Sequence, residues 1–471
     1  MAARDVTRGD IAPLLRSLWW PVLVAMLMQT AYALVNLAFV RSLGDAAIGA
    51  IGIGHQAFFI ILALGQMVGA TALADVSQAF GRGDVLGARR RFTFYALVAA
   101  GVGLVAALGA FLGAEAYVGA LTGDPATYRA GLDYFRASAP TFLFQLVVIV
   151  FAGSMRATGD FIVPMIIMVA SVVLNAILDA VFIFGLGPIA PMGVAGAAWA
   201  TVIAQGLSTV AYVVRLTRAR RHPRALAWAA PTGTRTAALR IVTRGLPAGL
   251  QFFAISAVTA MVLAGVKDLG VVWTGAASGG FRLAQQASLP IITLAMAVAA
   301  FAGQNVGARL GERVRRGAVI ALRWGLLYGV VAGGLLALLA TQIAPLGADS
   351  DDQVALVADY LRIAAPGFIA TALVFVPAFV LQAAGHMVAP MFAALVRVAV
   401  IAVIIYGVRP LLGLGPAWIF ASATVASFIE AAVALYFLRR FLRGLPSAEP
   451  VVVAAAPLPP IVRPPGVTDV S

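Results

Sequence analysis

The chain has no cysteine and very little charge. None of its 471 residues is Cys, and only 11% are Asp, Glu, Lys or Arg. The lack of thiols excludes disulfides, thiol catalysis and thiolate metal sites. Because 62% of the residues are hydrophobic, the chain has too little polar surface for a soluble protein of this length. Acidic residues are especially scarce, with 19 against 33 basic ones.

Long apolar runs occupy most of the chain. Twelve of them are long enough to cross a bilayer, which takes about 20 helical residues. We expect spans at approximately 17–40, 46–74, 92–114, 137–155, 161–185, 193–215, 242–266, 272–301, 318–341, 364–384, 388–408 and 415–438. The sequence therefore predicts an all-α polytopic membrane protein with twelve transmembrane helices, embedded in the lipid bilayer.

The basic residues form short clusters between these runs. Arginines gather within 4–16, 82–91, 215–244, 309–316 and 439–443, whereas the opposite connections contain Asp124, Asp133, Asp349, Asp351 and Asp352. By the positive-inside rule, both termini are expected in the cytoplasm. Clusters placed in this way are topology signals, so we expect no nucleic-acid partner.

The two halves of the sequence repeat each other in one constant register. Pro21 matches Pro247, Gln78 matches Gln304, and Gly81 matches Gly307, all at the same offset. Such a repeat predicts two six-helix bundles that point the same way, related by a pseudo-two-fold axis along the membrane normal. We divide the chain into an N-terminal lobe (1–216), a cytoplasmic Arg-rich linker (217–241), a C-terminal lobe (242–440) and a disordered Pro-rich tail (441–471).

One carboxylate lies in the middle of the fifth predicted span. Asp179 is the only charged residue between Asp160 and Arg215, and an ionisable group inside a membrane is costly and usually functional. Asn175 lies four residues earlier and Ser171 another turn earlier, so all three share one helical face. Thr201 and Gln205 form a similar polar stripe on the sixth span. These oxygen-bearing groups are suited either to Na⁺ or to a proton.

Three charged residues in the second half are secondary candidates. Glu430 lies mid-span on the twelfth helix, where it serves either as a second coupling group or as the partner of an arginine. Arg397 occupies the repeat position of Ser171, and it faces a cavity, pairs with Glu430 or contacts a backbone carbonyl. Arg282 lies near the seam between the two halves.

Several motifs in order resemble the multidrug and toxic compound extrusion (MATE) family, with its DinF-like prokaryotic branch most similar. They are VSQAFGRGD (76–84), GSMRATGDFIVP (153–164), VVLNAILDAVFIFGLGP (172–188), MGVAGAAWATVIAQ (192–205), RGLPAGLQ (244–251) and FAGQNVGARLGERVRRG (301–317). The pattern spans about residues 12–440. It implies a transporter in a prokaryotic cell membrane, and not an enzyme.

The resemblance implies an antiporter that exports organic cations, amphiphilic drugs or a natural product against H⁺ or Na⁺, with no other cofactor. It implies an ion site, including a possible Na⁺ site, at Asn36, Asn175, Asp179 and Thr201, and a bend of the first helix at Pro21. The family usually has an aspartate where this chain has Asn36, so a single carboxylate remains. We expect a monomer. A lipid or lipid-linked oligosaccharide flippase and a non-transporting sensor or scaffold are the alternatives.

Overall fold

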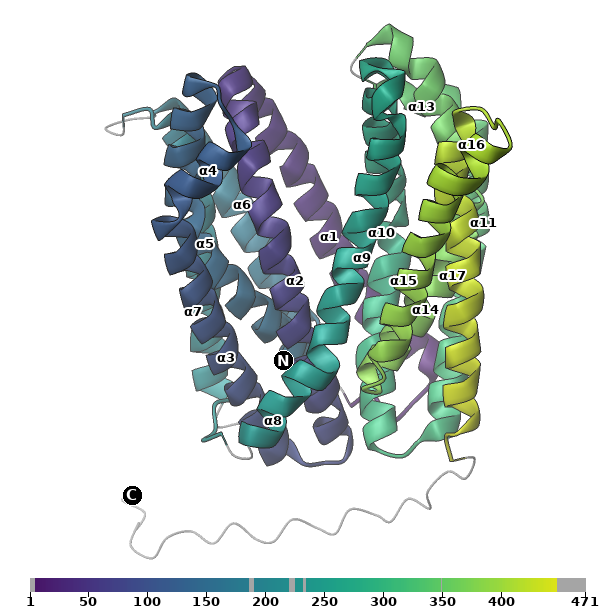
Figure 1. Cartoon of the computed structure of the whole chain (residues 1–471). Helices are drawn as coiled ribbons and strands as arrows, with labels where there is room; N and C mark the ends of the chain where they lie inside the picture. Colours follow the sequence, from purple (N-terminus) through teal and green to yellow (C-terminus); the bar gives the residue numbers. More distant parts are fainter. Residues whose placement is uncertain (1–4, 186–189, 220–224, 232–233, 349, 447–471) are drawn as a thin grey trace, which may run out of the picture.

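The structure is a computed structural model that describes residues 5–185, 190–219, 225–231, 234–348 and 350–446. Throughout these ranges, every regular element is a helix. The helices form two bundles, one from each half of the chain, which approach each other at the end that holds the N-terminus and diverge toward α13 and α16 (Figure 1). The predicted all-α class is confirmed.

The first bundle, here called the N lobe, contains six long helices and one short helix. They are α1 (Ile11–Arg41), α2 (Asp45–Gly81), α3 (Val85–Leu112), α4 (Ala114–Leu121), α5 (Pro125–Ala157), α6 (Ile162–Phe184) and α7 (Gly193–Arg218). Two aspartates fix helix starts, because Asp84 accepts a bond from Gly87 N (2.8 Å) and Asp124 accepts one from Thr127 N (2.8 Å). Such N-caps satisfy backbone donors at the membrane surface.

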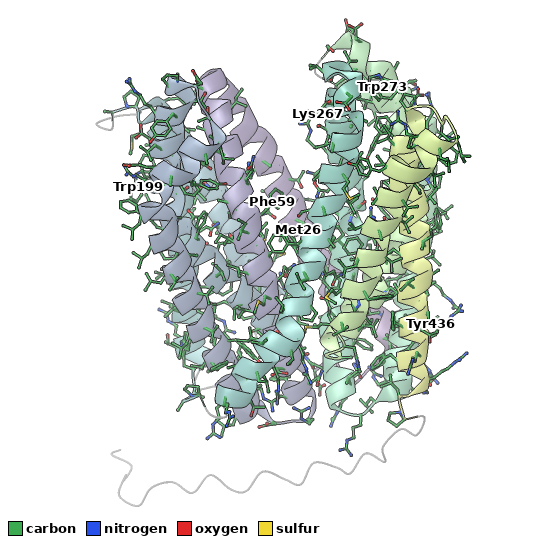
Figure 2. The ribbon with its side chains drawn as sticks, in the orientation of Figure 1. Met26, Phe59, Trp199, Lys267, Trp273 and Tyr436 are labelled. Atoms are coloured by element: carbon green, nitrogen blue, oxygen red, sulfur yellow. The ribbon has the colours of Figure 1, made fainter. Side chains whose placement is uncertain are left out.

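The second bundle, the C lobe, repeats this order. A connecting helix, α8 (Thr234–Arg240), precedes it. Its own helices are α9 (Leu246–Val266), α10 (Val271–Gly307), α11 (Gly311–Leu338), α12 (Ala340–Ile343), α13 (Asp351–Ala364), α14 (Gly367–Ala383), α15 (Val388–Ala402), α16 (Arg409–Leu411) and α17 (Ala417–Arg443). A π-helical turn, Ile241–Gly245, joins α8 to α9. The exposed aromatic residues Trp199 and Tyr436 lie on the outer sides of the two bundles (Figure 2), where a bilayer would cover them.

Within the described ranges, eleven helices are long and apolar enough to span a membrane, and α13 with α14 forms a twelfth candidate span, bent by 53°. The predicted span 364–384 therefore starts too late, because a break at Ala365 and Pro366 divides one span into two helices. Several other predicted spans are too short. The span predicted at 137–155 belongs to α5, which begins at Pro125, since polar residues extend the helix beyond its apolar part.

Two predicted boundaries also differ from the observed helices. The range 217–241, predicted as a linker, contains α8, and α17 continues to Arg443, inside the range predicted as a tail. Arg240 of α8 pairs with the buried Asp75 of α2 (2.6 Å), so this segment is anchored to the N lobe. Residues 447–471 of the predicted tail lie outside the described residues.

The first helix of each lobe crosses from one bundle to the other. At the beginning of α1, Leu15 and Leu18 belong to one buried apolar cluster with residues of α10 in the C lobe, and Trp19 Nε1 donates to the Pro290 carbonyl oxygen of α10 (3.1 Å). The later turns of α1 contact α6 of the N lobe. The beginning of α9 packs against α2, where a Cβ on Gly249 would lie 3.3 Å from the Ala63 carbonyl oxygen. Movement of one lobe relative to the other therefore has to act on α1 and α9.

Reciprocal contacts join the lobes where they meet. Gln78 Nε2 donates to the Ala383 carbonyl oxygen (2.8 Å), and Gln304 Nε2 donates to the Ala157 carbonyl oxygen (2.8 Å). The two glutamines occupy equivalent positions of the sequence repeat, and so do the two alanines. The contacts therefore follow the pseudo-two-fold symmetry that the repeat predicts.

Candidate functional site

A polar cluster lies inside the N lobe, where α1, α6 and α7 meet. The apolar helix α6 carries Asn175 and Asp179 one turn apart, so their side chains share one face. That face points into the lobe, since Asp179 is 0% exposed and Asn175 is 5% exposed. The opposite side of α6 carries exposed apolar residues such as Val173 and Ile177. The polar stripe of α6 therefore faces the interior of the lobe, and its apolar residues face outward.

Tyr32 of α1 connects the members of this cluster. Its hydroxyl lies 2.8 Å from Asp179 Oδ2 and 3.0 Å from Asn175 Oδ1. Asn36 lies one turn further along α1, and its Nδ2 is 3.1 Å from both the Tyr32 hydroxyl and Asp179 Oδ2. We did not predict Tyr32 from the sequence. The available signal was its spacing of four residues from Asn36, which places both on one helical face.

The sixth span completes the cluster through Thr201. Asn175 Nδ2 donates to Thr201 Oγ1 (3.2 Å), which itself donates to the Ala197 carbonyl oxygen one turn earlier (3.1 Å). Asn36, Asn175, Asp179 and Thr201 thus form one hydrogen-bonded group with Tyr32. No cluster of three or more His, Cys, Asp or Glu side chains suited to a metal ion occurs among the described residues. The oxygen atoms of this group are suited to a proton or Na⁺.

The hydrogen bonds around Asp179 lack one hydrogen when its carboxylate is ionised. Tyr32 has one hydroxyl hydrogen but two acceptors within reach, Asp179 Oδ2 and Asn175 Oδ1. If it donates to Asp179, Asn175 Oδ1 has no donor from Tyr32. Asp179 Oδ1 is also buried without a hydrogen-bond partner. A proton on Asp179 Oδ2 would donate to the Tyr32 oxygen and release the Tyr32 hydrogen for Asn175.

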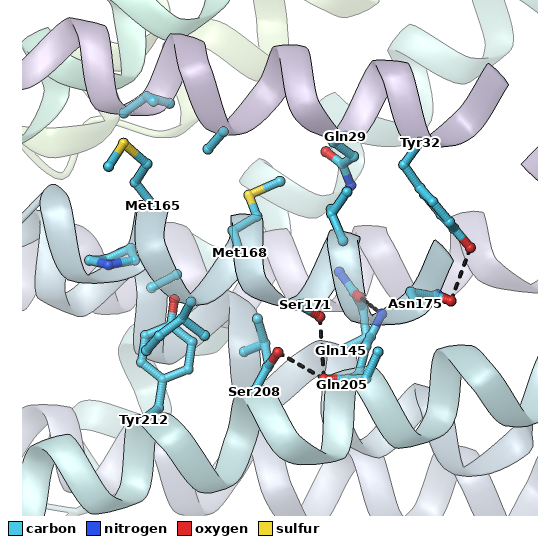
Figure 3. A pocket seen from close by; sticks show the side chains of 18 of the residues that line it. Gln29, Tyr32, Gln145, Met165, Met168, Ser171, Asn175, Gln205, Ser208 and Tyr212 are labelled. Atoms are coloured by element: carbon cyan, nitrogen blue, oxygen red, sulfur yellow. Dashed lines mark hydrogen bonds between the residues drawn. The ribbon is translucent and has the colours of Figure 1, made fainter. Parts of the chain in front are cut away.

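A cavity of about 200 Å³ opens beside the cluster, between α1, α5, α6 and α7. Ser171 and Gln205 line it, as do Gln145, Met168 and Tyr212 (Figure 3). Ser171 Oγ donates to the Ala204 carbonyl oxygen (3.2 Å), and Gln205 Nε2 donates to Gln145 Oε1 (2.7 Å). The predicted residues Ser171 and Gln205 therefore face the cavity but have no hydrogen bond to Asp179.

Three residues that also line the cavity are Pro21, Gln29 and Gln145. Pro21, predicted as the bending point of α1, lines the cavity and is buried. Gln29 and Gln145 also line it and were not predicted. Gln29 is three residues before Tyr32, which was a usable signal, whereas nothing in the sequence singled out Gln145.

The secondary candidates lie away from this cluster. In the C lobe, Arg397 of α15 pairs with the buried Glu430 of α17 (Nη1 to Oε2, 3.4 Å). Of the possible roles for Arg397 and Glu430, mutual pairing is therefore the one that their positions favour. Arg282 is exposed on α10 and does not line the cavity beside Asp179. On the same helix, Gln286 accepts a hydrogen bond from Thr30 of α1 (2.9 Å).

Known proteins resemble this chain over most of its length. The MatE family model matches residues 21–181 and 247–406, one region in each lobe. The multidrug export protein MepA of Staphylococcus saprophyticus is 24% identical over 428 residues, which cover 89% of this chain and 92% of MepA. An FAD transporter of Shewanella oneidensis is 25% identical over 356 residues, or 72% of this chain and 75% of that protein.

The fold also matches solved structures. The crystal structure of a mutant of the Vibrio cholerae MATE transporter VcmN is 20% identical in sequence and has a TM-score of 0.85, covering 92% of this chain and 97% of that one. This likeness supports the arrangement of helices in two bundles.

Proposed function

Because this chain belongs to the MatE family, the multidrug and toxic compound extrusion transporters, we propose that it exports organic cations or amphiphilic drugs in exchange for protons, with Asp179 as the exchange site. Membership of this family makes it a multi-pass membrane transporter of small molecules and not an enzyme. Family membership does not give the coupling ion, the direction of transport or the roles of single residues, and these are our proposals.

The observation that carries this proposal is the missing hydrogen in the Asp179 cluster. The Tyr32 hydroxyl oxygen lies within hydrogen-bond distance of both Asn175 Oδ1 and Asp179 Oδ2, and one added proton gives each of these two contacts a donor. Na⁺ would need several oxygen ligands to turn their lone pairs toward it, which the amide hydrogens of Asn36 oppose at Asp179 Oδ2. The geometry therefore favours a proton over Na⁺.

Exchange would follow from competition for one negative charge. Ionised Asp179 attracts a cationic substrate into the adjacent cavity, because a charge inside a lobe is screened far less than one in water. Protonation removes that charge and rearranges the hydrogen bonds of Tyr32 on α1. Since α1 also packs against α10 of the C lobe, a change at Tyr32 can alter how the lobes meet. We propose that this link couples proton uptake to alternating access.

We place the end where the lobes meet on the cytoplasmic side, with both termini. The arginine clusters of the α2–α3 and α10–α11 connections and of the end of α17 support this orientation, because positive loops remain in the cytoplasm. The two lobes would then rock relative to each other, with the movement acting on α1 and α9. A single chain that contains both lobes is expected to act as a monomer.

The test uses purified protein in liposomes loaded with ethidium, under a proton gradient or a Na⁺ gradient. We expect a proton gradient, acidic outside, to drive efflux. We expect Asp179→Asn to reduce the rate to that of protein-free liposomes, because the variant can neither ionise nor exchange a proton. The matched control is Asp133→Asn, which removes an exposed carboxylate from the same lobe and should leave efflux unchanged.

Each other outcome contradicts part of the proposal. Full efflux by Asp179→Asn would exclude Asp179 as the exchange site, and efflux driven only by Na⁺ would exclude protons as the coupling ion. If neither gradient moves ethidium although the protein is folded, export of organic cations is wrong. Lipid-linked or anionic substrates, with Arg282 and Arg397 as candidate ligands, would then be tested.

A further inference from the structure

The cavity beside Asp179 is elongated along α6. Met165 and Asn175 both line it, and ten residues of helix rise by about 15 Å. Figure 3 shows Met165 and Tyr212 at one end and Tyr32 and Asn175 at the other. The polar cluster therefore occupies only one end of the cavity.

An arginine lies at the Tyr212 end of the same cavity. Arg156, in the last turn of α5, lines the cavity together with Tyr212. Its Nε is buried without a hydrogen-bond partner. Among the described residues, no carboxylate lies within 4.0 Å of Arg156 to form an ion pair. A partly buried guanidinium that lines a cavity without a counter-ion is unfavourable.

The acidic residue closest to Arg156 in the sequence, Asp160, already has other partners. Asp160 lies between α5 and α6, where its Oδ2 is 3.7 Å from Arg215 Nη2 and its Oδ1 accepts a bond from Val163 N (3.2 Å). Asp160 therefore caps α6 and pairs with α7. The charge of Arg156 remains available to the cavity.

The C lobe shows what this position looks like without a charge. Gln382 is the repeat equivalent of Arg156, and its Nε2 donates to Gln251 Oε1 (2.8 Å). At the equivalent position of the C lobe, two neutral amide side chains therefore satisfy each other's hydrogen-bonding groups. The unpaired arginine occurs in the lobe that contains the cavity, so packing alone does not explain it.

We propose that Arg156 binds the carboxylate of a zwitterionic amphiphile, whose cationic end lies toward Asp179 and whose apolar part lies along Met168 and Val172. This subsite rests on the proposed export function and narrows its substrate class from cations to molecules with opposite charges at their two ends. Arginine is suited to the task, because its planar guanidinium can bind both oxygens of a carboxylate.

The test compares 11-aminoundecanoic acid with its methyl ester. The acid carries an ammonium and a carboxylate at opposite ends of an alkyl chain, and the ester lacks only the negative charge. We would measure the affinity of purified protein for each by isothermal titration calorimetry, with protein-free micelles as the blank. We expect the acid to bind roughly tenfold more tightly, which corresponds to one charged hydrogen-bonded contact.

Variants at Arg156 identify the residue responsible. Arg156→Gln, which copies Gln382, should bind acid and ester equally while its affinity for the ester is unchanged, and Arg156→Lys should regain part of the preference. The matched control is Arg218→Gln, which removes an exposed arginine of α7 and should behave as wild type. An equal loss of both affinities in Arg156→Gln would mean that Arg156 only supports the structure, and would overturn the proposal.

Two further results would also overturn it. The first is equal affinity of the wild type for acid and ester, a comparison that holds even if Arg156→Gln fails to fold. The second is loss of the preference when chloride is added to a low-salt buffer free of carboxylates, because Arg156 would then hold only an inorganic anion. Gradient-driven efflux is measured separately. Its absence in a protein that prefers the acid would contradict the antiport function but not the subsite.

Discussion

The two lobes have the same helices but opposite interiors. In the N lobe, a buried hydrogen-bonded group consists of Tyr32, Asn36, Asn175 and Asp179. In the C lobe, four buried apolar side chains occupy the equivalent positions of the repeat: Val258, Val262, Ile401 and Ile405. The duplicated bundle therefore accommodates either a polar site or an apolar core at these positions. The backbone also differs locally, because Ile405 lies in a π-helical turn (Val403–Val408).

This difference suggests to us that the two lobes have different roles in transport. A buried charge destabilises a lobe unless a ligand or a proton compensates it, whereas an apolar core stabilises its lobe unconditionally. The charges that the C lobe does bury, Arg397 and Glu430, neutralise each other. We infer that the N lobe performs the exchange and that the C lobe provides the rigid body against which it moves.

The largest expected effect comes from giving the N lobe the residue of the C lobe. Asp179→Ile copies Ile405, so we expect proton-driven efflux to fall to background and the melting temperature to fall as well, because the buried donors of Tyr32 and Asn36 lose their acceptor. Efflux in liposomes and thermal unfolding measure the two effects. Ile405→Val is the control, and it should keep transport with a loss of about 1 kcal/mol in stability. Transport by Asp179→Ile would remove the functional distinction between the lobes.

A second pair of variants tests the close contacts between the lobes, which are equivalent on the two sides. A Cβ on Gly81 would collide with the Gln304 carbonyl oxygen, and a Cβ on Gly307 with that of Gln78. We expect Gly81→Ala and Gly307→Ala to separate the lobes at this end and to slow efflux by a similar factor, roughly tenfold, or about 1.4 kcal/mol. Gly52→Ala, whose Cβ would meet nothing within 4 Å, is the control. Strongly unequal effects would argue against symmetric contacts.

A third variant asks whether the C-lobe ion pair is structural. Glu430→Gln leaves Arg397 without its charged partner, and breaking a buried pair costs about 3–5 kcal/mol. We expect a lower melting temperature but normal efflux from the folded protein. Glu115→Gln provides the comparison, because the pair of Glu115 with Arg136 is more exposed and contributes about 1 kcal/mol or less. Loss of efflux without loss of stability would instead assign Glu430 a coupling role.

The smallest effect concerns two titratable residues at equivalent positions, Asp160 and His386. Burial raises the pKa of Asp160, although Val163 N and Arg215 oppose the shift. Its stabilising contribution is therefore present near pH 4 and is lost as pH rises through the elevated pKa. Partial burial, together with Arg244, lowers the pKa of His386. The contribution of His386 is present above about pH 6.5 and is lost as pH falls.

Melting temperatures of single variants across pH measure these contributions. The melting temperature of Asp160→Asn relative to wild type should increase as pH rises above 4. The melting temperature of His386→Gln relative to wild type should increase as pH falls below 6.5. Asn still caps a helix, so the start of α6 is preserved. Parallel pH profiles for the two variants would contradict the opposite directions of the shifts.

The sequence by itself determined the membrane class, the twelve spans and the duplication. Apolar runs of sufficient length must be helical in lipid, because no other partner satisfies their backbone groups. The duplication is visible in the sequence because the matching residues are separated by one constant offset. It also identified Asn175 and Asp179 as one face of one helix, since a spacing of four residues is a local property. Helix ends were less accurate, because caps such as Asp124 lie outside the apolar runs.

Only the tertiary structure decided which polar residues meet. Tyr32 and Asp179 are 147 residues apart, and their contact depends on how α1 crosses from the C lobe to the N lobe. The same holds for Arg156, whose sequence context does not reveal that it faces a cavity, and for Arg397, whose partner Glu430 lies on another helix. Local periodicity sets the face of a helix, but packing of distant helices sets what that face contacts.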